Sequence, residues 1–233
     1  MSYVLLEHGG PVATLTLNRP DKLNALSTEL ERELGAALRT LGDARVLIIR
    51  GAGRAFCAGA DTEELDAATP AAALAYYAQT GNVYEQVASL PIPSIAQIHG
   101  WCVGGGLELA LACDLRVATP DTRFWFPEVE RAILPSRGGT ARVTRAVGPA
   151  LARRLILLGE KHDAAAALRF GLVHELGDAE LVAGWAATLA ARSPAAIQIA
   201  RTAIAVATDG PHSAAIAIER LGYAALTGMP EED

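Results

Sequence analysis

Cysteine is scarce in this sequence, and the cysteines that occur do not form a recognisable motif. Cys57, Cys102 and Cys113 make an odd number, and none lies at the spacing of a metal-binding motif. The five histidines are scattered along the chain and add no such spacing. We therefore expect reduced, buried thiols and no metal site.

Long apolar runs and basic charge are also lacking. No stretch of about 18 uninterrupted apolar residues occurs, and the N-terminus has neither the basic nor the apolar region of a secretory signal. The formal net charge is −6, and Lys22 and Lys161 are the only lysines. The missing apolar run and the missing signal lead us to expect a cytoplasmic protein that does not span a membrane. Because nucleic-acid binding relies on a basic surface, we do not expect nucleic acid as the main partner.

What the sequence does contain is apolar residues arranged in strand and helix patterns. Residues A, V, I, L, M, F, W, Y and C make up 51% of the 233 positions, enough for a sizeable core. Strand patterns come early and helix patterns late, which predicts an α/β fold with a core over 1–137, a helical region over 138–233, and no linker between them. Expected strands are 3–8, 12–18, 46–49, 94–98, 114–118 and 172–175. Expected helices start at Ser27 and cover 71–90, where Gly81 could interrupt the helix, 107–113, 139–147, 149–158, 163–169, 179–192, 195–208 and 212–226.

Two turns rich in small residues follow predicted strands, at 57–61 (CAGAD) and 103–108 (VGGGLE). Glycine lets a backbone approach a ligand closely, and a helix start offers free N–H groups. If the sheet brings the turns together, two N–H groups could converge on one carbonyl oxygen as an oxyanion hole. Such turns are also common without any function, and neither matches a phosphate-binding glycine motif.

Two glutamates near these turns are candidates for proton transfer. Glu108 lies in an apolar helix start, where a buried carboxylate without a partner has a raised pKa. It could instead cap its own helix or pair with an arginine. Glu128 follows Pro127 at another helix start, where capping or a surface position is the more common role.

Several segments, in this order, resemble the enoyl-CoA hydratase/isomerase family, the crotonase superfamily. The resemblance implies a spiral of ββα units followed by helices that build a homotrimer, often paired into a hexamer. It implies an acyl-CoA thioester as substrate and no separate cofactor, because coenzyme A is part of the substrate. The segments are VATLTLNRPDKLNALS, IIRGAGRAFCAGAD, IHGWCVGGGLELALACDLRVA, RFWFPEVERAILPSRGGTARVTRAVG and ALRFGLVHEL.

The same resemblance implies roles for individual residues. The backbone N–H groups of Ala60 and Gly105 would hold the thioester oxygen, Glu108 would activate the water that attacks C3, and Glu128 would protonate C2. The residues implied at the coenzyme A and substrate site are Lys22, Leu23, Ala25, Ala58, Ala60, Asp61, Thr62, Gly104, Gly105, Pro127 and Ser136.

We therefore expect hydration of a trans-2-enoyl-CoA to a 3-hydroxyacyl-CoA. An enoyl-CoA isomerase, another acyl-CoA lyase or a hydrolase are alternatives, and a non-catalytic acyl-CoA-binding trimer is an alternative of another class. The chain departs from the family pattern at Ser136 and Arg137, which stand where small residues are usual. An arginine there could meet a carboxylate on the acyl group or point to solvent. Family members typically continue into one more helix beyond the position that matches Asp233.

Overall fold

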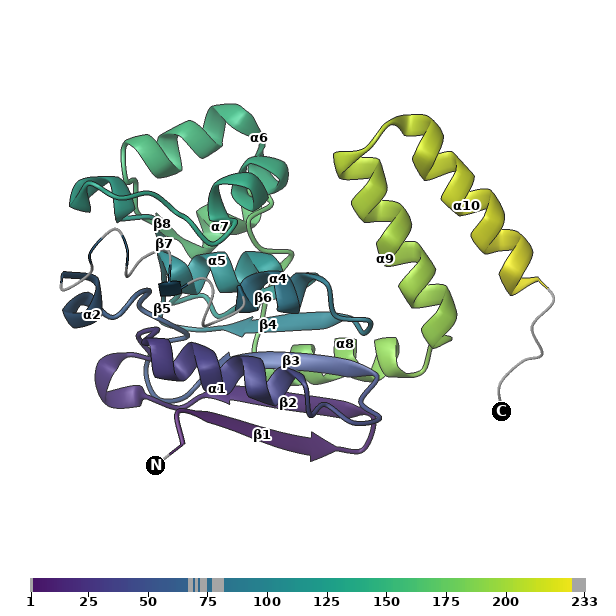
Figure 1. Cartoon of the computed structure of the whole chain (residues 1–233), viewed down its shortest axis with the longest axis horizontal. Helices are drawn as coiled ribbons and strands as arrows, with labels where there is room; N and C mark the ends of the chain where they lie inside the picture. The colour runs from purple at the N-terminus through teal and green to yellow at the C-terminus, as the bar shows by residue number, and fades with distance from the viewer. Residues whose placement is uncertain (1, 67–68, 70, 72–74, 77–81, 228–233) are drawn as a thin grey trace.

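A computed structural model describes residues 2–66, 69, 71, 75–76 and 82–227 (Figure 1). Its larger sheet has the strand order β1-β2-β3-β4-β6-β9. β1 and β2 form the antiparallel hairpin that the sequence predicts, and each later strand pairs in parallel with its neighbour. The strands are β1 (Val4–Gly9), β2 (Val12–Leu17), β3 (Val46–Gly51), β4 (Ser94–Ile98), β6 (Leu115–Ala118) and β9 (Glu175–Leu176).

A second, smaller sheet consists of short strands that the sequence did not reveal. These are β5 (Trp101–Val103), β7 (Arg123–Trp125) and β8 (His162–Asp163), in the order β5-β7-β8. Runs of two or three residues are too short to display the alternation that identifies a strand. Consecutive strands divide between the sheets: β4 lies in the larger and β5 in the smaller, and β6 and β7 repeat this division. This is the repetition of ββα units that was expected.

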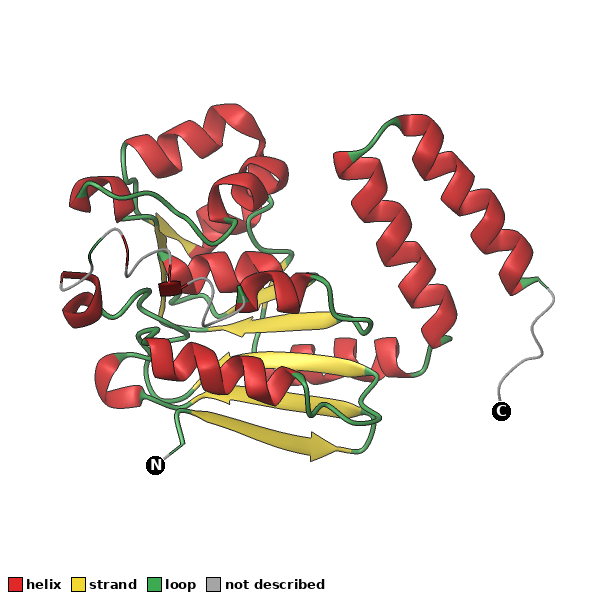
Figure 2. Ribbon diagram, viewed as in Figure 1, coloured by secondary structure: helices red, strands yellow, loops and turns green. Residues whose placement is uncertain are grey.

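Helices cover both faces of the larger sheet (Figure 2). α1 (Thr28–Leu38), α4 (Val83–Ala88) and α5 (Gly105–Ala112) contribute to the main core on one face. α8 (Ala179–Ala190) packs on the other face, where its buried side chains meet those of β3, β4 and β6. Burial on both faces explains why 46–49 is an unbroken apolar run.

The helical C-terminal region is present as predicted. It contains α6 (Gly139–Leu157), α7 (Ala164–Phe170), α8, α9 (Pro194–Asp209) and α10 (His212–Leu226). α9 and α10 lie against each other, to one side of the sheet (Figure 1). Among the described residues, no helix is long and apolar enough to cross a membrane.

One predicted element needs a correction of its bounds. The predicted strand 172–175 exists but is displaced: it begins only at Glu175, as β9, because Leu172 and Val173 donate backbone hydrogen bonds to Ala167 and complete the end of α7. The predicted helix 71–90 lies partly outside the described residues, and so does Gly81; within them, α4 begins after Asn82, whose φ is 46°. The predicted helices 139–147 and 149–158 are confirmed: together they make up α6, and Gly148 between them has a non-helical backbone, with φ 78° and ψ 160°.

The loop between β2 and α1 is held by one buried amide side chain, Asn24. Its Nδ2 donates to the carbonyl oxygens of Ala52 (2.9 Å), Ala55 (2.8 Å) and Phe56 (3.2 Å). Its Oδ1 accepts from the Arg19 N–H at 2.9 Å. Asn24 therefore joins the loop to the segment that follows β3.

Replacing Asn24 with alanine is expected to lower the free energy of unfolding by about 3 kcal/mol, because buried backbone groups lose their partners. Urea unfolding of the variant measures this change. The matched control is Asn18→Ala, since the Asn18 side chain donates an exposed hydrogen bond to the Ser2 carbonyl. Equal stability of the two variants would contradict a bridging role for Asn24.

Candidate active site

The structure brings the two glycine-containing turns into contact. Cys57 N–H donates to the Trp101 carbonyl, and Val103 N–H donates to the Cys57 carbonyl, each at 3.0 Å. A Cβ added to Gly106 would lie 2.5 Å from the Cys57 carbonyl oxygen, so only glycine permits this approach of α5. A Cβ added to Gly59, whose φ is 95°, would lie 3.5 Å from the nitrogen of Gly105. The two segments thus form one surface.

Each segment carries an N–H group for which the described residues provide no backbone acceptor. Leu26 and Ala60 form a parallel bridge, but its hydrogen bonds run from Leu26 N–H to Gly59 O and from Asp61 N–H to Leu26 O. The N–H of Ala60 takes no part in that bridge. Gly105 is the first residue of α5, where N–H groups have no intrahelical acceptor and the helix carries partial positive charge. These are the two positions predicted to hold a carbonyl oxygen.

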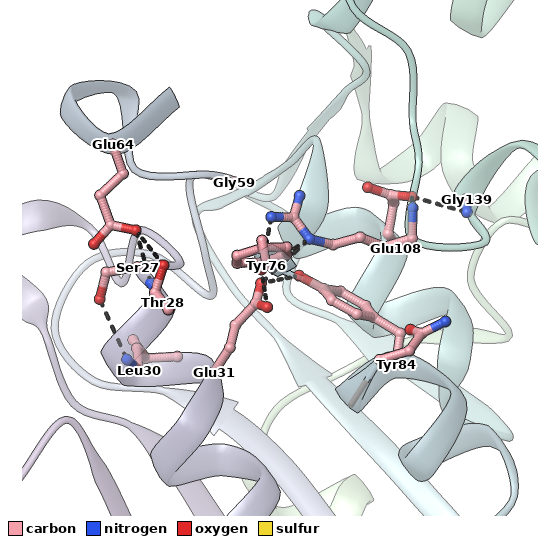
Figure 3. A network of polar contacts seen from close by, with 12 residues as sticks. Ser27, Thr28, Leu30, Glu31, Gly59, Glu64, Tyr76, Tyr84, Glu108 and Gly139 are labelled. Carbon is pink, nitrogen blue, oxygen red and sulfur yellow. Dashed lines mark hydrogen bonds and ion pairs between the residues drawn. The ribbon is translucent and has the colours of Figure 1, made fainter. Parts of the chain in front are cut away.

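Glu108 is buried in the first turn of α5 and is 1% exposed. Its Oε1 accepts from the backbone N–H groups of Arg137 (2.7 Å) and Gly139 (2.9 Å), and Figure 3 shows the contact with Gly139. Burial raises the pKa of this carboxyl, while the charge of Arg137 and the two N–H donors oppose the rise. The suggestion that Glu108 caps its own helix is wrong, because its hydrogen bonds go to the start of α6.

Glu128 begins the short 3-10 helix η2 (Glu128–Arg131) and is 7% exposed. Its Oε2 has no hydrogen-bond partner among the described residues. Burial raises the pKa of Glu128 to about 7, and the charge of Glu108 adds to the rise. A Cβ added to Gly104 would lie 2.8 Å from Glu128 Oε1, so this carboxyl lies against the start of α5. The surface role that the local pattern favours is therefore wrong.

A further buried carboxylate, Glu31, was missed. It lies on the buried face of α1 and is 0% exposed. Its oxygens contact the Tyr84 hydroxyl at 2.7 Å and the Tyr76 hydroxyl (Figure 3). One of them also lies 3.3 Å from Nε of Arg137. The helical spacing of the sequence indicates this burial, because Glu31 precedes Leu34 by three positions and Leu38 by seven and so lies on the same helix face as these leucines.

The pKa of Glu31 makes stability depend on pH. Burial raises this pKa from 4.5 to about 7, and Arg137 and Tyr84 oppose the rise. The folded protein therefore holds a proton that the unfolded chain releases, so the stabilisation is complete below pH 4.5 and is lost as pH rises through 7. Between pH 4.5 and pH 7, the free energy of unfolding of the wild type should fall by on the order of 3 kcal/mol relative to that of Glu31→Gln. Urea midpoints measured across this pH range test it, and parallel curves for the two proteins would contradict it.

The predicted coenzyme A residues lie on neighbouring loops. Leu23 O accepts from Ala58 N–H at 3.0 Å, which joins the loop before α1 to the loop after β3. Asp61 is buried and pairs with Arg19 at 2.5 Å, while Lys22 is exposed and pairs with Glu63 at 2.7 Å. The remaining predicted positions are Ala25 and Thr62 on these same segments, Pro127 beside Glu128, and Ser136, which is exposed.

Neither thiol nucleophiles nor a metal cluster emerges from the described residues. Cys57, Cys102 and Cys113 are all buried and free, and burial raises the pKa of each thiol, to about 12 for Cys57. A thiol with so high a pKa is protonated at neutral pH and is a poor nucleophile. Within the described ranges, no group of His, Cys, Asp and Glu is placed to hold a metal ion.

Comparison with known sequences gives one consistent match. The family model for enoyl-CoA hydratase/isomerase matches residues 7–227. The (E)-benzylidenesuccinyl-CoA hydratase of Thauera aromatica is 38% identical over 216 residues, which cover 89% of this chain and 84% of that protein. The short-chain-enoyl-CoA hydratase of Clostridium acetobutylicum is 34% identical over 212 residues, covering 88% and 81%.

Comparison with solved structures agrees. The enoyl-CoA hydratase of Thermoplasma volcanium superimposes with a TM-score of 0.93 at 31% identity, covering 99% of this chain and 94% of that one. The enoyl-CoA hydratase of Bacillus anthracis has the same TM-score and identity, with 98% and 92% covered. These likenesses extend over the sheets, the loops at the site and the C-terminal helices.

Proposed function

Because the chain belongs to the enoyl-CoA hydratase/isomerase family, we propose that it hydrates a trans-2-enoyl-CoA to the corresponding 3-hydroxyacyl-CoA. The family and its relatives make it an enzyme of the hydratase type, a lyase acting on an acyl-CoA thioester. The observation that carries the specific reaction is the pair of buried carboxylates, Glu108 and Glu128, beside the N-terminus of α5.

The first part of the proposed mechanism is polarisation of the thioester. Its carbonyl oxygen accepts hydrogen bonds from the N–H groups of Ala60 and Gly105. As water adds to C3, negative charge moves onto this oxygen, and the enolate is stabilised where the helix start is positive. The proximity of the 57–60 and 103–106 segments supports this assignment.

The second part is proton transfer, for which the two glutamates have different surroundings. Two backbone N–H donors and Arg137 favour the ionised form of Glu108, which suits it to take a proton from the attacking water. Glu128 has a pKa of about 7 and an oxygen without a partner among the described residues, which suits it to deliver a proton to C2. Environments that push two pKa values apart are the expected basis of such a division.

Binding of coenzyme A and assembly complete the proposal. The loop 20–25 and residues 58–62 form the wall for the pantetheine and nucleotide, with Lys22 able to exchange Glu63 for a phosphate. The helical region, through its exposed apolar residues such as Leu221 and Tyr223, builds a homotrimer or a dimer of trimers.

The test is incubation of the protein with crotonyl-CoA while the absorbance of the enoyl thioester is followed. Loss of the band with formation of 3-hydroxybutyryl-CoA is the expected result. Conversion of a 3-enoyl-CoA to the 2-enoyl isomer without hydration would identify an isomerase. Tight binding of a saturated acyl-CoA with no reaction of either enoyl-CoA would identify a non-catalytic binder.

A further inference from the structure

Arg137 is one of the two residues at which the chain departs from the family pattern, and its backbone and side chain contact different parts of the site. Its backbone N–H donates to Glu108. Its guanidinium contacts α1, where Nε lies 3.3 Å from Oε1 of Glu31. Its Nη1 is also an immediate neighbour of the start of α5, because a Cβ added to Gly105 would lie 3.5 Å from it. The cation is therefore next to the residue proposed to hold the thioester oxygen.

The surroundings of the guanidinium are aromatic and only slightly exposed to solvent. Arg137 stacks over the rings of Tyr76 and Tyr84, with its Cζ 5.0 Å and 5.5 Å from their centroids. Its Nε and Nη2 donate to the Tyr76 hydroxyl at 3.3 Å and 2.8 Å. The side chain is 15% exposed. A planar cation held in this way has its orientation set before any ligand arrives.

Stability alone does not account for the ion pair between Glu31 and Arg137. Well-packed apolar residues commonly replace a buried ion pair with no loss of stability, because the pair must first be stripped of water. Glu31 lies on a helix face whose other buried members include Leu30, Leu34 and Leu38, so an apolar residue would suit its position. A charge retained there points to a role in recognising a charged or polar group.

We propose that Arg137, held by Glu31 and Tyr84, forms a subsite for a carboxylate on a short acyl group. This rests on the proposed function and names its substrate class: a CoA monothioester of a dicarboxylic acid. Arginine binds carboxylates through paired N–H donors. The chain between the thioester carbon and the carboxylate is short, because the guanidinium lies so close to Gly105.

Charge balance around the guanidinium is compatible with this ligand. Glu31, Glu108 and Glu128 all act on Arg137 electrostatically. Burial raises the pKa of Glu31 and of Glu128 to about 7, so both are substantially protonated at neutral pH. When an acyl carboxylate arrives, it pairs with Arg137, while protonated Glu31 keeps its contact with the Tyr84 hydroxyl at 2.7 Å.

The deciding experiment measures binding of two saturated thioesters of equal carbon number, glutaryl-CoA and pentanoyl-CoA, by calorimetry at pH 7. Wild type should bind glutaryl-CoA about 10- to 100-fold more tightly, the contribution expected of charge-assisted hydrogen bonds. Arg137→Met should abolish the preference by weakening only glutaryl-CoA binding. Glu31→Gln should strengthen glutaryl-CoA binding, because it removes the ionised fraction of Glu31 that still competes for Arg137 at pH 7 and keeps a polar group beside Tyr84.

The matched control is Arg131→Met, which removes an exposed arginine of η2 that pairs with Asp66; it should leave the preference unchanged. Equal or weaker binding of glutaryl-CoA by wild type would overturn the proposal without any variant. If Arg137→Met weakened the binding of glutaryl-CoA and pentanoyl-CoA equally, the arginine would only stabilise the fold. Saturated thioesters cannot be hydrated, so this binding test does not depend on turnover. The hydratase function is tested separately, and failure to hydrate either crotonyl-CoA or glutaconyl-CoA would overturn it.

Discussion

Glu128→Gln is expected to lower kcat for hydration of an enoyl-CoA by about 10²–10⁴-fold, the usual contribution of a general acid or base. Glutamine matches glutamate in shape but cannot deliver a proton to C2. Glu108→Gln should have an effect of similar size, because the amide cannot accept the proton of the attacking water. Steady-state kinetics with crotonyl-CoA measure both losses, and calorimetry with a saturated acyl-CoA should show that binding is retained.

Glu130→Gln is the matched control for these variants. Glu130 lies two residues from Glu128 on the same 3-10 helix, but it is exposed. It should keep the activity of the wild type. If either site variant retained more than about a tenth of wild-type kcat, that carboxylate would not be a proton-transfer group in the sense argued here.

Gly105→Pro is expected to lower kcat by about 10²–10³-fold by deleting one proposed oxyanion donor. Proline is well tolerated at the first residue of a helix, where its missing N–H has no intrahelical acceptor to lose. Gly105 occupies that position in α5. The substitution therefore removes the donor while α5 remains able to form. Turnover of crotonyl-CoA and circular dichroism, measured on the same sample, separate loss of the donor from loss of the fold.

Gly105→Ala is the control that separates the N–H group from the side chain. It adds a Cβ, 3.1 Å from Leu26 Cδ1, but retains the N–H. The tip of a leucine can move by a few tenths of an ångström, so only a modest loss of kcat is expected. Equal losses in the alanine and proline variants would mean that crowding by Leu26, and not the missing donor, reduces the rate.

The sequence was sufficient for features whose signal is local or has a strong period. The hairpin of β1 and β2, the apolar strand β3 and the amphipathic helix α1 follow from alternation, turn residues and helical spacing. The short strands β5, β7 and β8 offered too few residues for such a signal. Leu172 and Val173 look like a strand because they are apolar, but that character reflects burial at the end of α7.

The candidate site shows a similar limit. The turns at 57–61 and 103–108 could be singled out from their small residues, but their contact depends on pairing between Cys57 and Cys102, which lie far apart in the chain. Glu128 looked like a capping residue because nothing next to it in sequence predicts burial. Glu31 went unnoticed among the charges of α1, although its helical spacing places it with buried leucines.

The two proposed oxyanion donors belong to the main chain, and this has an evolutionary consequence. A substitution that leaves the backbone in place cannot erase the N–H of Ala60 or Gly105 unless it introduces proline. The part of the site that polarises a thioester is thus largely insulated from point mutation. Recognition of the acyl group, by contrast, would depend on side chains such as Arg137. A lineage with this architecture would be able to exchange one acyl group for another while inheriting the activation of the carbonyl unchanged.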